Sequence, residues 1–468
     1  MFMGTMLTTI LAVALPAEEV GIAQSLELSY SEALWVQAVY PLMMSICLIP
    51  FGRLADRHGL MRFYLTGLGI WGFFSVACAL ASGGVFLVAM RSLQGVGGAC
   101  MSATAMALVT VSFPPEERGK GLGLNAMAGY LGLMVGPPLG GVIVAHVSWR
   151  WVFLVSLPLV LVTVVCGLPL LRAERRDREA SVELRAPHAD ARPDWRGTLL
   201  LALTMVALLV PLISVPFWGW TNPPTLGLLG CFVLLLAAFI VVELRVREPL
   251  LNIDLVRKNR VFAAGTTAAL LNYAAIYGVT AFTAVYLEIV EGYSAKRTGL
   301  LLLTSPIFIA GLSAVFGRLS DRIGQRIPAT GGMLLAATGT AQLGFLPTPA
   351  PMWRVILALS FLGLGMAAFS SPNTSSVMGS VDQSKLSLAA GFLGTMRTAG
   401  QGISIGLLGA IAASSLGPTG GRVLFLGEKA SRAAAESFSS GYRTAMLVAA
   451  GLAVAGALVS LVRGPRSD

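Results

Sequence analysis

The chain has 468 residues, of which 55% are hydrophobic and only 12% charged, and its formal net charge is +10. Water-soluble domains contain about 25% charged residues, so this composition excludes a soluble enzyme or binding module, and five cysteines are too few for a disulfide framework. The basic balance would suit a nucleic-acid partner unless the placement of the charges explains it.

Apolar stretches that could cross a membrane recur along the whole chain. A spanning helix needs about 20 mostly apolar residues. Fourteen such stretches are predicted, near residues 1–20, 33–51, 63–82, 86–111, 121–145, 151–171, 197–217, 225–246, 262–287, 298–316, 328–347, 353–377, 388–413 and 441–462. The first reaches Pro16 and two glutamates early. It lacks a basic leading segment and the membrane pattern continues after it, so a signal peptide is not predicted.

The lysines and arginines predict the orientation of these stretches. If the N-terminus is cytoplasmic, 23 of the 33 basic residues fall in cytoplasmic segments and 8 in outer ones, while Arg91 and Arg397 lie within predicted helices. Basic residues concentrate on the cytoplasmic side of membrane proteins. We therefore expect both termini in the cytoplasm, and the basic charge then gives no support for a nucleic-acid partner.

An internal repeat predicts the architecture. Residues 52–59 recur as residues 317–324 with six of eight positions identical, and eight predicted helices separate the copies. This offset predicts two six-helix units with two extra helices between them. The predicted domains are an N-terminal six-helix bundle (1–171), cytoplasmic linkers with two extra transmembrane helices (172–261) and a C-terminal six-helix bundle (262–468).

The repeated segment has residues suited to a cytoplasmic turn. Glycine allows a tight turn, and the aspartates are expected to cap the next helix while the arginines stay at the headgroups. We expect two matching copies to have a conformational role, the alternative being an ordinary turn with positive-inside charges. The residues concerned are Gly52, Asp56, Arg57, Gly59, Gly317, Asp321 and Arg322.

Further motifs follow in a fixed order. They lie at residues 91–99, 129–141, 148–153 and 396–400, in addition to the pair at 52–65 and 317–326. Together they resemble the major facilitator superfamily, and within it the fourteen-helix drug:proton antiporters.

The resemblance implies an all-α polytopic membrane protein with 14 transmembrane helices arranged 6 + 2 + 6. It implies a secondary transporter, not an enzyme, that exports hydrophobic or amphipathic organic compounds by proton antiport with rocker-switch alternating access. It further implies small organic substrates, the bacterial inner membrane, a functional monomer, no metal and no cofactor besides the proton gradient.

Individual motif residues gain expected roles from the resemblance. It implies that Arg91 couples proton and substrate movement, the alternative being an arginine that snorkels to the outer surface; Arg397 has the same two interpretations. Gly136, Pro137 and Gly141 are expected to form a hinge between the halves, which is compatible with simple helix packing.

The first predicted helix departs from the family pattern. Leu7 and Ala12 occupy positions where the family usually carries an Asp and an Asn, and the helix begins late. Proton antiport normally needs a carboxylate that burial brings to titrate near neutral pH. No acid is central, and the coupling candidates are Glu288 and then Glu32, each of which could instead be an exposed carboxylate at the cavity mouth.

The substrate cavity is expected between the two halves. Apolar residues should dominate it, which suits neutral, amphipathic or anionic molecules better than dications. The polar and aromatic candidates are Gln37, Tyr40, Gln94, Asn125, Asn272, Tyr273, Tyr277 and Asn373, with Arg397.

Two other functions remain open. A facilitator or lipid/metabolite exporter would need no proton coupling, and a transport-inactive membrane sensor would keep the fold alone. The missing acid and the late first helix favour these alternatives, whereas intact motifs in both halves argue against the sensor.

Overall fold

The computed structural model describes residues 2–16, 21–112, 118–180, 194–246, 253–381, 386–415 and 432–462. Within these residues all regular structure is helical. The first part of the chain forms α1 (Phe2–Ala14), α2 (Ile22–Ser25), α3 (Tyr30–His58), α4 (Leu60–Ala79), α5 (Gly84–Ser112), α6 (Arg118–His146), α7 (Trp151–Leu154) and α8 (Leu157–Ala180).

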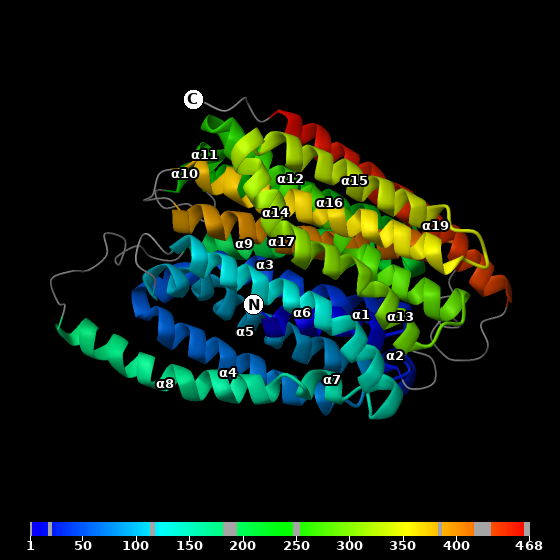
Figure 1. The fold of residues 1–468 in the computed structure, drawn as a ribbon, viewed down its shortest axis with the longest axis horizontal. Helices are drawn as coiled ribbons and strands as arrows, with labels where there is room; N and C mark the ends of the chain where they lie inside the picture. The colour runs from blue at the N-terminus through cyan, green and yellow to red at the C-terminus, as the bar shows by residue number, and fades with distance from the viewer. Residues whose placement is uncertain are drawn as a thin grey trace.

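The second part continues the same pattern. It forms α9 (Trp195–Trp218), α10 (Pro223–Arg245), α11 (Ile253–Lys258), α12 (Arg260–Val285), the π-helix η2 (Tyr286–Val290), α13 (Ala295–Leu302), α14 (Thr304–Ile323), α15 (Arg326–Gly344), α16 (Met352–Gly379), α17 (Leu386–Ala413) and α19 (Arg432–Leu461). The long helices lie roughly alongside one another in one bundle (Figure 1).

The helices coincide with the apolar stretches of the sequence. Eleven helices of the described residues are long and apolar enough to cross a membrane, and α1 is a shorter apolar helix. The prediction of a helical membrane protein is therefore confirmed. The helix α8 runs nine residues past the expected end at 171, and residues 181–193 of the expected linker lie outside the described residues.

Local sequence signals fix several helix starts. Ser29 and Glu32 form a capping box at the start of α3, in which two otherwise unbonded backbone amides gain partners. The Asp194 side chain accepts a hydrogen bond from the Gly197 amide at the start of α9, and Asn259 caps α12 in the same way. We call the end of the bundle where α3 begins, and where α7 lies, the α7 end, and the opposite end the α11 end (Figure 1).

The repeated segments form the ends of α3 and α14. Gly59 and Gly324 stop the two helices with φ angles of 106° and 84°, a region that glycine adopts without steric cost. The expected aspartate caps are wrong: the N-cap residues of α4 and α15 are Gly59 and Gln325, and neither helix has a side-chain cap. The reason is that α3 and α14 continue to their terminal glycines, so Asp56 and Asp321 lie within these helices and not at the turns.

Two seams join helices of the first and second parts of the chain. One is formed by α3 and α17, the other by α6 with α13 and α14, and α1 also contacts α12. The helix α9 packs on both α3 and α17, where Gly402 and Gly406 of α17 leave room for Leu209 and Leu212. The helix α9 therefore covers the α3–α17 seam.

Candidate functional site

Arg91 is held inside the bundle by three contacts. It lies on α5 and is only 2% exposed. Its Nε donates a hydrogen bond to the Val36 carbonyl of α3 (3.3 Å), and its Nη1 donates to Gln94 Oε1 (2.6 Å). Its guanidinium also lies 4.8 Å from the centre of the Tyr40 ring. The snorkelling alternative is thus wrong, because the buried side chain finds its partners within the bundle, on α3 and on its own helix.

Gln94 extends this network to a third helix. Its Nε2 donates to Ser75 Oγ of α4 (2.7 Å), and Ser75 donates to the Trp71 carbonyl (2.8 Å). Gln94 is fully buried. In this structure its amide is used entirely within the helix contacts. The i, i+3 spacing places it beside Arg91 on one helix face, and its amide orients the guanidinium.

Glycines of the same motif bring α3 close to α5. A Cβ on Gly95 would lie 2.9 Å from the Tyr40 carbonyl oxygen, and one on Gly98 would overlap the Tyr40 hydroxyl. Only glycine leaves room for this tyrosine against α5. The motif at residues 91–99 thus builds one unit: an arginine, the amide that orients it and the space for the ring it contacts.

Tyr277 connects this unit to the second part of the chain. It lies on α12, where its side chain is close to Thr8 of α1 and to Arg91 and Tyr40. The polar group formed by Arg91, Gln94, Ser75, Tyr40, Tyr277 and Thr8 is named the Arg91 cluster below. It reaches from α4 to α12, across the contact between α1 and α12.

Arg397 forms a second, smaller group on α17. Its Nη2 donates to Thr374 Oγ1 of α16, and its guanidinium lies 5.8 Å from the centre of the Tyr273 ring of α12. All three side chains are partly exposed. Its Nε is buried without a hydrogen-bond partner. We name these three residues the Arg397 cluster.

The acidic candidates differ in their surroundings. Glu288 is completely buried within the π-helical turn η2, so an exposed position at a cavity mouth is wrong for it. Glu32 is half-buried and accepts hydrogen bonds from the Ser29 amide (2.8 Å) and hydroxyl (2.7 Å). Its capping role explains its position without a coupling function. Glu18 and Glu19 lie outside the described residues.

The other predicted cavity residues do not converge on one point. Asn272 and Asn373 are fully buried, and Gln37 and Asn125 are half-buried. The amide of Asn272 has no hydrogen-bond partner, whereas the Asn373 Oδ1 lies 3.7 Å from a Cβ placed on Gly265 of α12. The structure therefore joins Tyr40, Gln94 and Tyr277 to Arg91, and Tyr273 to Arg397, while the asparagines and Gln37 stay outside both clusters.

The glycines of the α6 motif lie at two helix contacts. A Cβ on Gly136 would overlap the Thr9 hydroxyl of α1, and one on Gly141 would lie 2.5 Å from the Ala295 carbonyl oxygen of α13. On the other side, a Cβ on Gly299 would overlap the Pro137 carbonyl. The α6 seam is therefore tightly closed near the α7 end. At the same end, the Tyr30 hydroxyl donates to the Gly409 carbonyl across the α3–α17 seam (3.0 Å).

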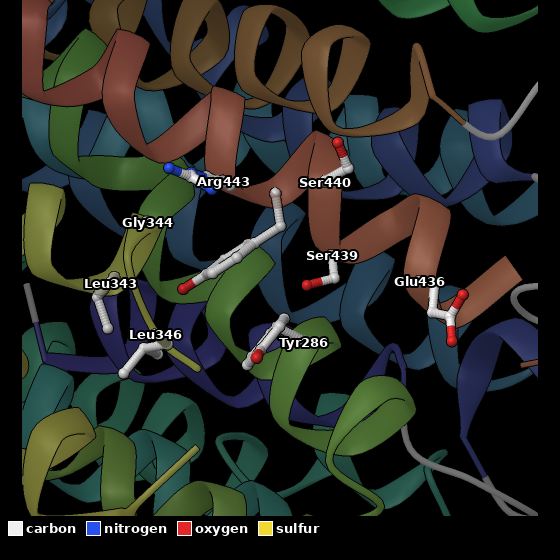
Figure 2. Close-up of a pocket in the computed structure, with 9 residues that line it drawn as sticks. Tyr286, Leu343, Gly344, Leu346, Glu436, Ser439, Ser440 and Arg443 are labelled. Atoms are coloured by element: carbon white, nitrogen blue, oxygen red, sulfur yellow. The ribbon is translucent and has the colours of Figure 1, made fainter. Parts of the chain in front are cut away.

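A surface pocket lies apart from both clusters. It has a volume of about 290 Å³ and opens at the α7 end between α15, η2 and α19. Figure 2 shows Tyr286, Ser439 and Glu436 among the side chains that line it. The remaining lining residues are Leu343, Gly344, Leu346, Ser440, Tyr442 and Arg443. None of the predicted cavity residues belongs to it.

Sequence reasoning missed several partners. Thr8, Ser75 and Thr374 complete the two clusters, and the Val36 carbonyl holds Arg91. Serines and threonines are frequent in apolar helices, where they commonly bond to their own backbone. No local sequence pattern distinguishes these three residues from the other serines and threonines of the chain, because their partners lie on other helices.

The sequence of this chain matches a known protein family. The profile of the Major Facilitator Superfamily matches residues 1–405. The multidrug resistance protein Stp of Mycobacterium tuberculosis (strain ATCC 25618 / H37Rv) is 31% identical over 389 residues, which are 82% of this chain and 70% of that protein. The tetracenomycin C resistance and export protein of Streptomyces glaucescens is 31% identical over 411 residues, 88% of this chain and 73% of the relative.

A solved structure shares the fold. The inward-facing, unoccupied crystal structure of a bacterial homologue of the human lysosomal transporter Spinster superposes with a TM-score of 0.63 at 16% identity, covering 99% of this chain and 94% of that one. At this identity the likeness concerns the fold alone.

Proposed function

Because this chain belongs to the major facilitator superfamily, we propose that it exports hydrophobic or amphipathic organic compounds by proton antiport with rocker-switch alternating access. Membership makes the chain a multi-pass membrane transporter of small organic substrates and not an enzyme. The finer statement draws support from relatives named for multidrug resistance and for tetracenomycin C resistance and export, and from the placement of Arg91.

The proposed architecture is 14 spans in a 6 + 2 + 6 order. It adds α1, α15 and α17 to the eleven candidate spans, with α9 and α10 as the extra pair and domains at 1–171, 172–261 and 262–468. Its support is the pairing at the seams. The helices α3 and α14, which end in the two repeated segments, each contact a helix of the opposite half, α17 and α6 respectively.

We assign the α11 end to the cytoplasm of a bacterial inner membrane, with both termini inside and a monomer as the functional unit. The positive-inside charge balance supports this orientation. The contacts of Gly141 with Ala295 and of Tyr30 with Gly409 then close the outer end. During transport these contacts would separate as the opposite end closes.

The observation that carries the proposal is the buried Arg91 cluster. An arginine inside a membrane protein is costly and is characteristically kept for a functional reason. Tyr277 and Thr8 lie close to it, on helices α12 and α1 that belong to different halves. Separation of the halves would break this connection, so the energy of the cluster depends on the conformational state.

Glu288 is the proposed proton carrier. It is a completely buried acid on a π-helical turn, and such turns are frequent at functional sites. It follows directly on α12, which also carries Tyr277. Protonation of this carboxylate could therefore be transmitted along one helix to the Arg91 cluster.

The test is transport by the purified full chain in proteoliposomes. Ethidium serves as a cationic probe and tetracycline as an uncharged or zwitterionic one, with and without a pH gradient. The proposal expects accumulation that requires the gradient and disappears when nigericin collapses it. Transport of either probe at the same rate without a gradient would contradict proton antiport.

One specific observation supports the facilitator alternative. Leu7 occupies the position where the family usually has an acid, and Leu7 is buried. Downhill movement indifferent to nigericin would favour this alternative. Binding without movement of any probe would favour the transport-inactive sensor.

A further inference from the structure

Among the residues that the structure describes, Arg397 contacts no group that would neutralise its charge. Its partners are the Thr374 hydroxyl and the Tyr273 ring, and no carboxylate is among them. Arg397 lies eleven residues into α17, about 16 Å along the helix axis. A cation at such depth is costly unless an anion or a polar partner relieves it.

The buried acids of the described residues lie elsewhere. Glu288 belongs to η2 at the opposite end of α12. Glu243 is on α10, where its carboxylate lies beside Gly197 of α9. Neither the α9–α10 contact nor η2 involves a residue of the Arg397 cluster, so the positive charge is available to a molecule from outside the chain.

The Arg397 cluster also has free hydrogen-bonding capacity and access. The buried Nε lacks a partner, although a guanidinium can donate five hydrogen bonds. Arg397, Tyr273 and Thr374 are all partly exposed, unlike Arg91. A ligand could approach this guanidinium without displacing a buried network.

The cluster lies along the contact between the halves. Tyr273 and Tyr277 are four residues apart on α12 and share one helix face. Tyr277 meets Thr8 of α1, so Tyr273 faces the same side one turn nearer the α11 end. In the proposed orientation this is the cytoplasmic side, from which an exporter loads its substrate.

We propose that the Arg397 cluster binds the acidic group of an amphipathic organic anion, a carboxylate or phenolate attached to an apolar ring system. Arg397 supplies the charge and guanidinium donors, Thr374 keeps the guanidinium in place, and the Tyr273 ring contacts the apolar part. This assignment of substrate class rests on the proposed transport function. Arginine favours such oxyanions because its donors are planar and permanently charged.

The test uses three probes with one ring system and different charge: 1-naphthoate, 1-naphthamide and 1-naphthylmethylammonium. Equilibrium binding to the purified full chain in detergent micelles is measured by calorimetry without any gradient. We expect naphthoate to bind about 10-fold more tightly than naphthamide and the ammonium compound to bind weakest. Arg397→Gln should remove this preference and leave naphthamide binding within about 2-fold, whereas Arg397→Lys should retain part of it.

Arg354→Gln is the matched control, because Arg354 is an exposed arginine stacked on Trp353 at the start of α16. It should bind all three probes as the unmodified chain does. Equal affinities for the three probes, or an Arg397→Gln variant that keeps the preference for naphthoate, would overturn the inference. Arg397-dependent naphthoate binding by a chain that transports none of the probes would support the site and overturn the transport proposal instead.

Discussion

The two arginine clusters use the same residue in opposite ways. Arg91 is nearly fully buried, and hydrogen bonds from two of its nitrogens fix it against α3 and Gln94. Arg397 is partly exposed and donates one side-chain hydrogen bond, to the Thr374 hydroxyl. Its Nε is buried and has no hydrogen-bond partner. Both stack on a tyrosine. The comparison separates a guanidinium held by the protein from one with capacity left for a ligand.

This difference follows from packing. The Arg91 motif includes Gly95 and Gly98, which let α3 approach α5 closely enough for Tyr40 and the Val36 carbonyl to reach the arginine. Gly400 in the Arg397 motif instead brings α17 against α12, where a Cβ would lie 3.0 Å from Tyr273 Cβ. That contact positions one ring but gives the guanidinium no amide partner like the Gln94 side chain beside Arg91. Satisfied polar networks rigidify a structure, whereas unsatisfied groups invite a partner.

The largest expected effect comes from Arg91→Ala. Its loss should lower transport of every substrate by about 100-fold, since a coupling free energy of about 3 kcal/mol is removed whatever the ligand. Initial rates in proteoliposomes measure this effect. Gel filtration of the detergent-solubilised variant checks that it remains folded, and Arg354→Ala serves as the control. Normal rates in the Arg91 variant would remove the assigned role.

Glu288→Gln should uncouple transport from the proton gradient. One unit of pH gradient corresponds to about 1.4 kcal/mol per proton. Substrate accumulation driven by a one-unit pH gradient should therefore fall by about 10-fold if one proton is exchanged per substrate molecule. Glu32→Gln is the matched control, because Glu32 has a capping role. The measurement is steady-state accumulation with and without nigericin. Unchanged accumulation by the Glu288 variant would place the proton elsewhere.

Substitutions of the hydrogen-bond partners, Gln94 of Arg91 and Thr374 of Arg397, should have different effects on transport. Gln94→Ala removes the amide that orients Arg91 and leaves a buried donor without its acceptor, so rates should fall by about 10-fold for all probes. Thr374→Ala removes one contact of a partly exposed arginine and should cost about 2-fold, only for anionic probes. Equal effects of the two substitutions on all probes would erase the distinction between the clusters.

The smallest effects concern the tyrosines. Tyr277→Phe removes the hydroxyl that lies close to Thr8 and Arg91 and should slow transport by about 3-fold. Tyr273→Phe keeps the ring on which Arg397 stacks and should change naphthoate affinity by less than about 2-fold. Calorimetry and initial rates on the same preparations compare the two. A larger effect of Tyr273→Phe would mean that its hydroxyl contacts the ligand.

The sequence predicts the helices well because membrane spans need long apolar runs, which are visible locally. It also indicates Arg91 and Gln94 together, since i, i+3 residues share a helix face. Sequence-based prediction fails for side chains whose partners lie on other helices. Ser75, Thr8 and Thr374 look like ordinary small polar residues until α4, α1 and α16 pack beside the arginines.

Two errors have the same origin in geometry. Asp321 was expected at a turn, but α14 continues to Ile323 before Gly324 ends it. For Glu288 the alternative to a coupling role was an exposed carboxylate at the cavity mouth, yet the chain turns into a π-helix there and buries it. Neither the exact helix end nor a π-helical turn has a strong local sequence pattern.

The most direct measurement compares naphthoate and naphthamide transport by the unmodified chain, Arg91→Ala and Arg397→Gln in the same proteoliposome preparation. The account predicts that Arg91→Ala lowers transport of both compounds equally, whereas Arg397→Gln lowers naphthoate transport by about 10-fold and spares naphthamide. If the two variants showed the same pattern across the two probes, the division of roles between the arginines would be wrong.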